Sequence, residues 1–546
     1  MGKHDWKSSR KITLTFKKII GIAAFITVIV LATILFSNLE TQIMTENKKT
    51  TDERSASELT LQNVNISKNI PDSVFKSKYV TIYSLPNKTG PNGILVDRND
   101  VVWTSGSFSQ SLFRLDPRDG NLTSYLIPEE KHSNTMVWSM VEDKDGNIWF
   151  SQFGSNPLWL FDPHIKKFNS YHTSYPPFQM KVDNTTGDIW FTTLIGNTVG
   201  VIQKVENKTE SSYKIIEFPL GASTTPSGLF LKDDAVWVAE LSTGKIIKFK
   251  ILRNNDGLVV NIIKTLELPQ PDKIRFSSPI DVLVQNNETI WVTEHAPSTI
   301  SEYDIKSNSW KRFSTARTIP PIPTLPFWMR ESLDHKGIWF NEHQGDRIAF
   351  LNITDHILTE FNIPNNQVPD PSPYMINNPI SRQNIAAQND YYSTIFTLNL
   401  SLDPTNPNKF WFSQWDNNKV GMVDRTEIVP FDIHSDLTKI IFSDNNTTQT
   451  AIINAVVLGK NITIPNKDNH NVIFLSASSS MRTDGGFEKI VANFTTNTVS
   501  LSRSDQTVPV QLVLQNEGAK PGNYTVGISA SNGLVTKTTF VDLEIR

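Results

Sequence analysis

Two Glu-His pairs are the residues of this chain whose types and spacing could do chemistry. Glu294-His295 ends the stretch IWVTEH, and Glu342-His343 ends the stretch IWFNEH, in a chain with only 10 histidines. Carboxylates bind divalent cations, and imidazoles accept or donate protons near neutral pH. The repeated pair therefore predicts a catalytic group made of His295, His343, Glu294 and Glu342.

Further polar and aromatic residues extend this candidate site. Glu240 stands where Glu294 and Glu342 stand in their own stretches, so these three carboxylates are candidate ligands for a divalent metal ion. The candidate ligand-binding residues are Trp138, Gln152, Trp328, Arg330, Gln414 and Trp415. The alternative interpretation is that these side chains only solvate a channel mouth, that the Glu-His pair arose by duplication, and that Arg330 bridges two structural repeats.

A tryptophan frame that occurs seven times must position these residues. The frames are VVWTSGS, NIWFSQF, DIWFTTL, AVWVAEL, TIWVTEH, GIWFNEH and KFWFSQW, with Trp103, Trp149, Trp190, Trp237, Trp291, Trp339 and Trp411. A spacing of roughly 40–50 residues indicates a solenoid, a propeller or an array. The longer interval before the last frame is explained if the polar segment 365–394 is a loop insertion, which could fold over the site.

Each repeat resolves into four short strands. In the fifth repeat they read DVLVQ, IWVTE, ISEYD and WKRFS, with turn residues between them and no sustained helical period. Four strands per repeat are typical of a β-propeller blade, so seven repeats predict seven blades. The tryptophans are predicted to wedge between neighbouring blades. Either the segment 78–86 or the segment 428–433 would supply the outermost strand that closes the ring.

The predicted fold class is all-β: a seven-bladed β-propeller, a C-terminal immunoglobulin-like β-sandwich and one N-terminal transmembrane helix. The expected segments are a basic cytoplasmic segment (1–18), a membrane anchor (19–37), a polar stalk (38–70), the propeller (71–433) and the sandwich (434–546). The sandwich is expected because residues 434–546 lose the tryptophan frame but keep spaced strands and hairpin signals.

Residues 19–36 form an uncharged apolar run that would span about 27 Å as a helix, close to the ~30 Å hydrocarbon core of a bilayer. Six Lys or Arg residues precede the run, so the positive-inside rule places the N-terminus in the cytoplasm and the rest of the chain outside the cell. A cleaved signal peptide is the alternative.

Composition agrees with an extracellular location. Cysteine is absent, which excludes disulfides and Cys-based metal sites, and a net charge of −3 offers no case for nucleic-acid binding. Asn-x-Ser/Thr glycosylation motifs are dense, which predicts a glycoprotein. They begin at Asn65, Asn87, Asn121, Asn184, Asn207, Asn287, Asn352, Asn399, Asn445, Asn446, Asn461, Asn493 and Asn523.

Over residues 78–433 the frame G/D-x-I/V-W-F/V-S/T-x, with its closing F-x-I/L-P, resembles the streptogramin (virginiamycin B) lyase family. The resemblance implies a seven-bladed propeller that opens a cyclic depsipeptide by Mg²⁺-dependent elimination. It also implies acidic residues at Glu294, Glu342 and, more loosely, Glu240. The family's histidine in P-H-A/G-I/V has no counterpart in PNGI, VWSM, PFQM, PSGL, SPID, FWMR or IFTL, so His295 or His343 would have to replace it.

Two functions follow as hypotheses. The first is a membrane-anchored ectodomain whose propeller face binds a glycan, a peptide or an envelope protein. The second is an extracellular lyase or hydrolase that depends on a divalent metal.

Overall fold

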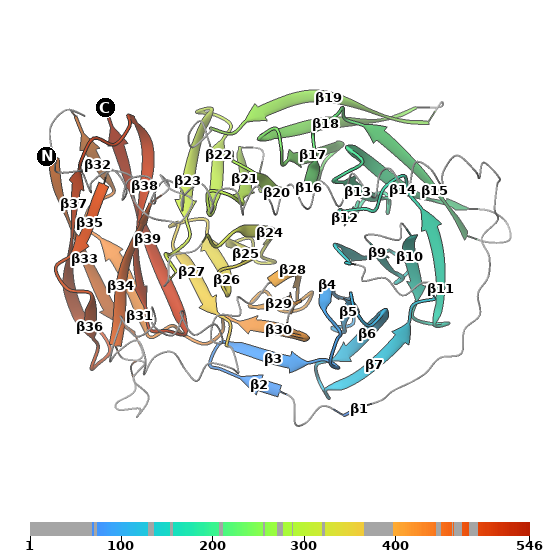
Figure 1. Cartoon of the computed structure of the whole chain (residues 1–546), viewed down its shortest axis with the longest axis horizontal. Helices are drawn as coiled ribbons and strands as arrows, with labels where there is room; N and C mark the ends of the chain where they lie inside the picture. Colours follow the sequence, from blue (N-terminus) through green and yellow to red (C-terminus); the bar gives the residue numbers. More distant parts are fainter. Residues whose placement is uncertain are drawn as a thin grey trace, which may run out of the picture. The chain divides into compact units, whose positions relative to one another are not determined.

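The computed structural model describes residues 68–69, 74–128, 136–152, 157–206, 211–254, 257–269, 277–286, 288–318, 323–364, 397–415, 417–443, 449–460, 462, 472–479 and 490–546. Every regular element within these ranges is a β-strand (Figure 1). The described ranges contain no helix of the length and apolarity that a membrane crossing needs. The predicted anchor 19–37, nearly all of the predicted stalk 38–70 and the segment 365–394 lie outside the described residues.

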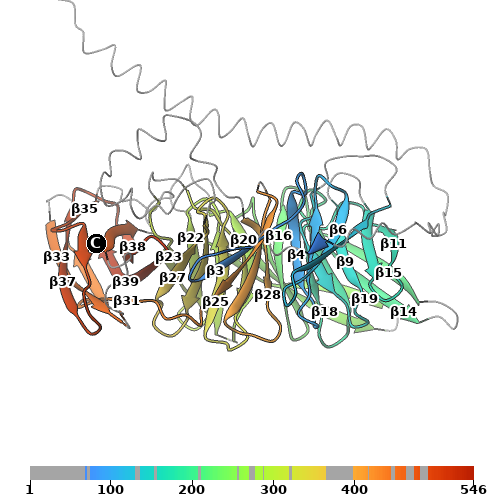
Figure 2. The ribbon, with the colours of Figure 1, turned by 90° about the horizontal axis from the view of Figure 1, so that it is seen from below.

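From β3 to β30 the strands form seven runs of four antiparallel strands, each run in its own sheet, which makes this part of the chain a β-propeller (Figures 1 and 2). The first blade comprises β4 (Pro91–Val96), β5 (Val102–Gly106), β6 (Ser111–Asp116) and β7 (Asn121–Leu126), and the second comprises β8 (Met140–Glu142), β9 (Ile148–Ser151), β10 (Pro157–Asp162) and β11 (Lys167–His172). The third blade comprises β12 (Gln179–Val182), β13 (Ile189–Thr193), β14 (Thr198–Glu206) and β15 (Ser211–Pro219). The fourth comprises β16 (Pro226–Lys232), β17 (Ala235–Glu240), β18 (Lys245–Asn254) and β19 (Gly257–Glu267).

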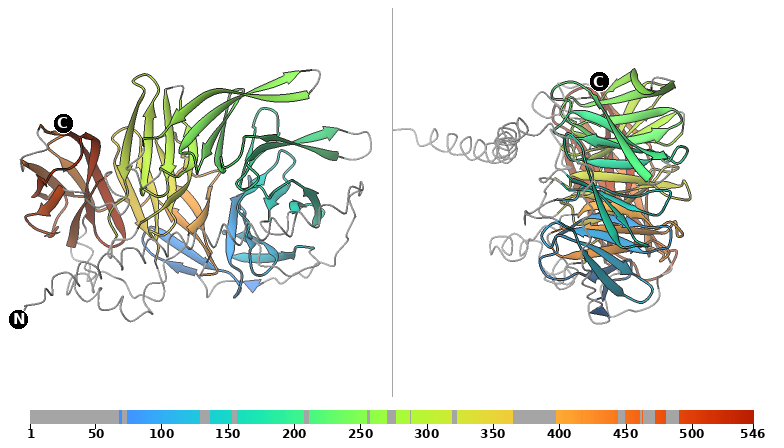
Figure 3. Two further views of the ribbon diagram at one scale, coloured as in Figure 1. Left: turned by 45° about the horizontal axis from the view of Figure 1, so that its top comes forward. Right: turned by 90° about the vertical axis from the view of Figure 1, so that its right-hand side faces the viewer.

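The fifth blade comprises β20 (Pro279–Val284), β21 (Thr289–Glu294), β22 (Thr299–Asp304) and β23 (Ser309–Ser314). The sixth comprises β24 (Pro326–Glu331), β25 (Gly337–Glu342), β26 (Arg347–Asn352) and β27 (Leu358–Asn362). The seventh comprises β28 (Thr397–Leu402), β29 (Lys409–Gln414) and β30 (Lys419–Asp424), together with β3 (Val80–Ser84). The outer hairpins β14–β15 and β18–β19 are the long green ribbons of Figure 3.

The seven frame tryptophans are all buried on the second strand of their blades, with exposed fractions of at most 4%. Each packs against the next blade: Trp103 lies in one core cluster with Ile148 and Phe150, and Trp339 stacks on Phe410 with ring centroids 4.9 Å apart. The predicted role of the tryptophans as wedges between blades is confirmed. Burial of a large apolar ring at every blade interface explains why the frame recurs.

The ring is closed by the N-terminal strand β3. It pairs antiparallel with β30, with Val80 opposite Val423 and Ser84 opposite Lys419, so the seventh blade contains strands from both ends of the propeller. This confirms the segment 78–86 as the closing strand. Two short strands add to outer edges: β2 (Val74–Lys76) pairs with β3, and β1 (Lys68–Asn69), at the end of the predicted stalk, pairs with β7.

The C-terminal part consists of two sheets that share one core. The first contains β31 (Phe431–Ser435), β33 (Gln449–Gly459), β37 (Thr507–Asn516) and β35 (Ile490–Phe494); the second contains β32 (Lys439–Phe442), β34 (Val472–Ser479), β36 (Thr498–Ser500), β38 (Gly522–Ser531) and β39 (Val535–Ile545). The sandwich starts at Phe431, within the segment 428–433 that was the other candidate for ring closure. Its strand β39 pairs with β27, so the second sheet continues into the sixth blade.

Candidate functional site

In the third to seventh blades, the last residue of the tryptophan frame directly follows the second strand of the blade. His295 and His343 take this place in the fifth and sixth blades, and Leu194, Leu241 and Trp415 take it in the third, fourth and seventh. All five side chains are partly exposed. The register is the same in each case, because the preceding residue pairs with the first residue of the third strand. The same loop position in five blades therefore supplies a row of apolar, aromatic and imidazole side chains, which we call the loop-face row.

In each of these five blades, the residue that precedes the loop-face row has its side chain on the opposite side of the strand, because successive side chains along a strand alternate. Glu294 is fully buried within its own blade. Its carboxylate accepts hydrogen bonds from Arg312 Nε at 2.7 Å and Arg312 Nη2 at 2.6 Å, and from the hydroxyl of Ser301. Both carboxylate oxygens are thus used inside the blade.

Glu342 is also fully buried in its blade, next to a second carboxyl group. Arg347 Nη1 lies 3.7 Å from Glu342 Oε2 and donates a hydrogen bond of 3.2 Å to Glu360 Oε1. Glu360 Oε1 also accepts a hydrogen bond of 2.8 Å from the Ala316 amide. Burial and the neighbouring Glu360 carboxylate raise the pKa of Glu342 well above its usual range. The protonated form of Glu342 is therefore favoured to a higher pH than in an exposed glutamate.

Glu240 is buried as well, and Oε2 accepts a hydrogen bond of 2.6 Å from the Thr243 hydroxyl. Burial raises the pKa of Glu240 above its usual value. The expected convergence of Glu240, Glu294 and Glu342 does not occur, since each carboxyl is held within its own blade. The described residues contain no group of three or more His, Asp or Glu side chains arranged to hold a metal ion. These carboxylates do not fit the Mg²⁺ that the family resemblance implies.

The two histidines do converge. The ring centroids of His295 and His343 are 5.6 Å apart, and the Phe327 ring lies 5.5 Å from the first and 5.3 Å from the second. His295 Nδ1 is 3.2 Å from the Pro326 carbonyl oxygen, which can only accept, so Nδ1 carries the proton. Burial lowers the pKa of His295 to about 4 and that of His343 to about 3, the latter also through the charge of His295. Both imidazoles are neutral at physiological pH.

Aromatic rings continue from the histidines toward the innermost strands. Phe327 contacts Trp328 at 4.7 Å and Trp138 at 6.2 Å, and Phe178 lies 4.9 Å from Trp138 and 5.3 Å from Trp328. We call the set of His295, His343, Phe327, Phe178, Trp138 and Trp328 the imidazole–aromatic cluster. Trp138 is partly exposed, whereas Trp328 is 1% exposed and belongs to the core.

The remaining predicted ligand-binding residues are dispersed. Gln152 and Gln414 are buried, and Gln152 Oε1 accepts a hydrogen bond of 2.6 Å from the Trp159 indole. Trp415 is partly exposed, and its ring lies 5.5 Å from that of Phe108. Arg330 lies two residues beyond Trp328 and donates to Asp281 at 3.4 Å across a blade boundary. The bridging interpretation of Arg330 matches this contact.

The sequence patterns did not single out Phe178, Phe327 or the partners Arg312 and Glu360. A signal was present for the two phenylalanines, because they lie in PFQM and FWMR, at the entry to innermost strands. No local signal marks Arg312 or Glu360, because each lies two strands beyond the glutamate that it contacts.

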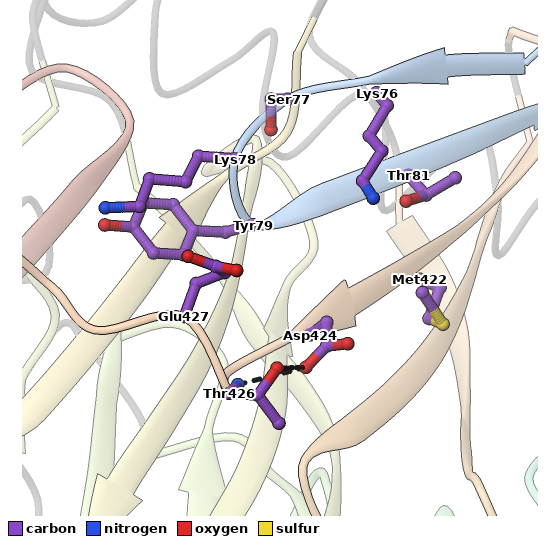
Figure 4. Close-up of a pocket in the computed structure, with 9 residues that line it drawn as sticks. All are labelled: Lys76, Ser77, Lys78, Tyr79, Thr81, Met422, Asp424, Thr426 and Glu427. Atoms are coloured by element: carbon purple, nitrogen blue, oxygen red, sulfur yellow. Dashed lines mark hydrogen bonds between the residues drawn. The ribbon is translucent and has the colours of Figure 1, made fainter.

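A separate pocket of about 310 Å³ lies between the N-terminal hairpin and β30 (Figure 4). The Lys78 ammonium lies 5.3 Å from the centre of the Tyr79 ring and donates to the Ile428 carbonyl at 3.1 Å. Burial, and the nearby Glu427 carboxylate, raise the pKa of Tyr79 far above its usual value, so this phenol stays neutral. None of the predicted site residues lines this pocket, whose groups join the closing strand to the segment that enters the sandwich.

Comparisons with known proteins give the following likenesses. The family model described as two component regulator propeller matches residues 131–154. A virginiamycin B lyase from Staphylococcus aureus is 20% identical, with a TM-score of 0.46 over 63% of this chain and 98% of that chain. A streptogramin B lyase structure is 18% identical, with a TM-score of 0.47 over 63% of this chain and 97% of that chain. Hydrazine synthase from Kuenenia stuttgartiensis is 9% identical, with a TM-score of 0.43 over 62% of this chain and 97% of that chain. No curated protein sequence matches this chain.

Proposed function

We propose that this chain is a membrane-anchored extracellular β-propeller protein that binds a ligand or an envelope partner through the loop-face row and the imidazole–aromatic cluster. One observation supports this function over catalysis: the glutamates are held inside their blades, and the histidines next to them join an aromatic cluster. The site therefore presents neutral rings, without the paired charges that proton transfer or metal binding needs.

The chemistry of the partly exposed side chains indicates the kind of ligand. Trp138 and Trp415 offer aromatic rings, Leu194 and Leu241 offer apolar surface, and the neutral imidazoles of the cluster add polar edges. Such a surface suits the apolar face of a sugar ring or an aromatic peptide side chain. A strongly charged ligand would find no counter-charge among these side chains.

Binding is tested with the purified full-length chain on arrays of glycans and peptides. Trp138→Ala and the double variant His295→Ala/His343→Ala are expected to weaken binding of the retained probes at least tenfold, about 1.4 kcal/mol. Trp310→Ala is the matched control, because Trp310 is partly exposed on the outermost strand of the fifth blade, away from the cluster. Unchanged binding in both cluster variants would exclude this face as the binding site.

The alternative function, a metal-dependent extracellular lyase or hydrolase, requires Glu294 to leave Arg312. Addition of Mg²⁺ or Mn²⁺ would then raise the melting temperature of the chain, and Glu294→Ala with Glu342→Ala would remove the increase. We expect no metal-dependent increase.

The membrane topology rests on the apolar run 19–36, its basic flank and the glycosylation motifs. Because the chain has no cysteine, a single introduced thiol reports its own location. We expect Ser307→Cys, in an exposed turn of the fifth blade, to react with a membrane-impermeant maleimide on intact cells. Ser8→Cys is expected to react only after lysis. The reverse pattern would refute the proposed orientation.

The immunoglobulin-like type of the C-terminal sandwich is part of the same proposal.

A further inference from the structure

The innermost strands carry an unusual pair of cations. In each blade one residue of the innermost strand pairs with the frame tryptophan, so these seven residues stand at the same level of the ring. They are Leu95, Val141, Lys181, Phe230, Leu283, Arg330 and Ser401. Only Lys181 and Arg330 are charged, and both are positive. They come from the third and sixth blades and are partly exposed.

One carboxylate, Asp281 of the fifth blade, acts electrostatically on both cations, and it is buried. Its Oδ1 accepts from Gln179 Nε2 at 3.1 Å and from the Val282 amide at 3.0 Å. Its Oδ2 accepts from the Met329 amide at 3.0 Å and from Arg330 Nη1 at 3.4 Å. Most of the acceptor capacity of Asp281 therefore serves backbone amides and the Gln179 side chain.

Several donors of the two cations have no acceptor in the described part of the chain. Arg330 Nη1 donates to the Met329 carbonyl at 2.7 Å and to Asp281. The Nε and Nη2 groups of Arg330 and the ammonium of Lys181 make no hydrogen bond to another described residue. The guanidinium thus keeps planar N–H groups for an acceptor with more than one oxygen.

The positive charges of Lys181 and Arg330 outnumber the single carboxylate in a half-buried place. Burial lowers the pKa of Lys181 to about 7, and the charge of Arg330 contributes to this decrease. The Asp281 carboxylate partly offsets the decrease. Burial also lowers the pKa of Arg330. Two cations beside one carboxylate leave one positive charge uncompensated, which is unfavourable where both side chains are largely removed from water. A bound anion would remove this imbalance and hold Lys181 in its protonated form.

We propose that Lys181 and Arg330 form a binding site for an oxyanion group, a sulfate, phosphate or carboxylate, at the inner edges of the third and sixth blades. This site is distinct from the loop-face row, because it lies at the level of the frame tryptophans. Arg330 supplies directed N–H donors and Lys181 supplies a point charge. Asp281 keeps the innermost strands together through the backbone amides that it accepts.

The site is tested on the purified full-length chain with sodium sulfate and sodium acetate, each compared with sodium chloride at equal ionic strength. Because sulfate stabilises proteins in general, the informative quantity is the gain in melting temperature relative to matched variants. Lys181→Met and Arg330→Met are expected to lose a large part of the gain, whereas the control Lys306→Met, at an exposed lysine, keeps all of it. A loss with sulfate indicates a phosphate-like or sulfate-like ligand, and a loss with acetate indicates a carboxylate ligand. Equal gains in all four proteins with both anions would overturn the proposal.

A second measurement uses the unmutated chain, so it does not depend on the folding of the variants. After reductive ¹³C-methylation, one lysine resonance is expected to titrate several pH units below the others and to shift to a higher pKa on addition of sulfate. The affinity for sulfate should fall about tenfold for each pH unit above the pKa of Lys181, as its ammonium loses the proton. A spectrum in which every lysine titrates near 10 and ignores sulfate would exclude the site.

Discussion

Glu294 and His295 are neighbours in the chain, yet their side chains take part in different structures. The Glu294 carboxylate lies inside its blade against Arg312, whereas the His295 ring packs against His343 of the next blade, 5.6 Å away. The alternation of side chains at the end of a strand causes this separation. The Glu-His pair is therefore two features, a structural carboxylate and a member of the imidazole–aromatic cluster.

The buried ion pair of Glu294 and Arg312 is expected to be essential for stability. Glu294→Gln and Arg312→Met should each lower the free energy of unfolding by about 3–5 kcal/mol, because each leaves a buried charge without its partner. The double variant Glu294→Met/Arg312→Met should lose less than the sum of the two. Urea denaturation measures all three, and Glu288→Gln, which breaks an exposed pair with Lys306, is the control with an expected loss below about 1 kcal/mol. A fully stable Glu294→Gln chain would contradict the structural role.

The raised pKa of Glu342 makes stability depend on pH. The folded chain keeps the Glu342 proton to a higher pH than the unfolded chain, so this stabilisation is complete below the pKa of an unfolded glutamate, about 4.3, and is lost as pH rises toward the folded value. Glu342→Gln mimics the protonated acid. It is expected to match the unmutated chain at pH 4 and to exceed its stability at pH 8 in urea denaturation. The same stability difference at both pH values would mean that Glu342 is ionised in the fold.

The lowered pKa values of His295 and His343 act in the opposite direction. Unfolded histidine binds a proton near pH 6.5, whereas these residues stay neutral down to about pH 4 and about pH 3, so stability is present above pH 6.5 and is lost as pH falls. The loss is at most about 1.4 kcal/mol per histidine for each pH unit. His295→Asn/His343→Asn should flatten the dependence of unfolding free energy on pH between 7 and 5. The exposed His172→Asn is the control, and an equally steep dependence in the double variant would refute the assignment.

Ring closure by β3 predicts that a charge in this strand disrupts the whole propeller. Ile82 is 1% exposed and lies opposite Gly421 on β30. Ile82→Asp is expected to lower the unfolding free energy by at least about 3 kcal/mol, because it buries an unpaired charge. Ile165→Asp is the control, because this side chain is 67% exposed and should tolerate the change. Equal stability of the two variants would show that the seventh blade does not need β3.

Much of the propeller could be predicted from the sequence, because each blade repeats a local pattern. The strands expected for the fifth repeat correspond to β20, β21, β22 and β23, and every frame tryptophan lies on a second strand. The closing strand was ambiguous, because the segments 78–86 and 428–433 have similar local patterns. Pairing of β3 with β30 and of β31 with β33, both between distant parts of the chain, decided between them.

The sequence alone determined the repeat, the buried tryptophans and the nearness of His295 to His343. Equal loop positions of adjacent blades lie side by side in a ring, whereas the glutamates before these histidines point into their own blades. Only the tertiary structure decided the partners of each polar group. The pairs Glu294–Arg312, Glu342–Glu360 and Asp281–Arg330 depend on strands and blades that pack side by side. The physical reason is that burial and charge compensation act across space between residues far apart in the chain, and no local pattern records which of them meet.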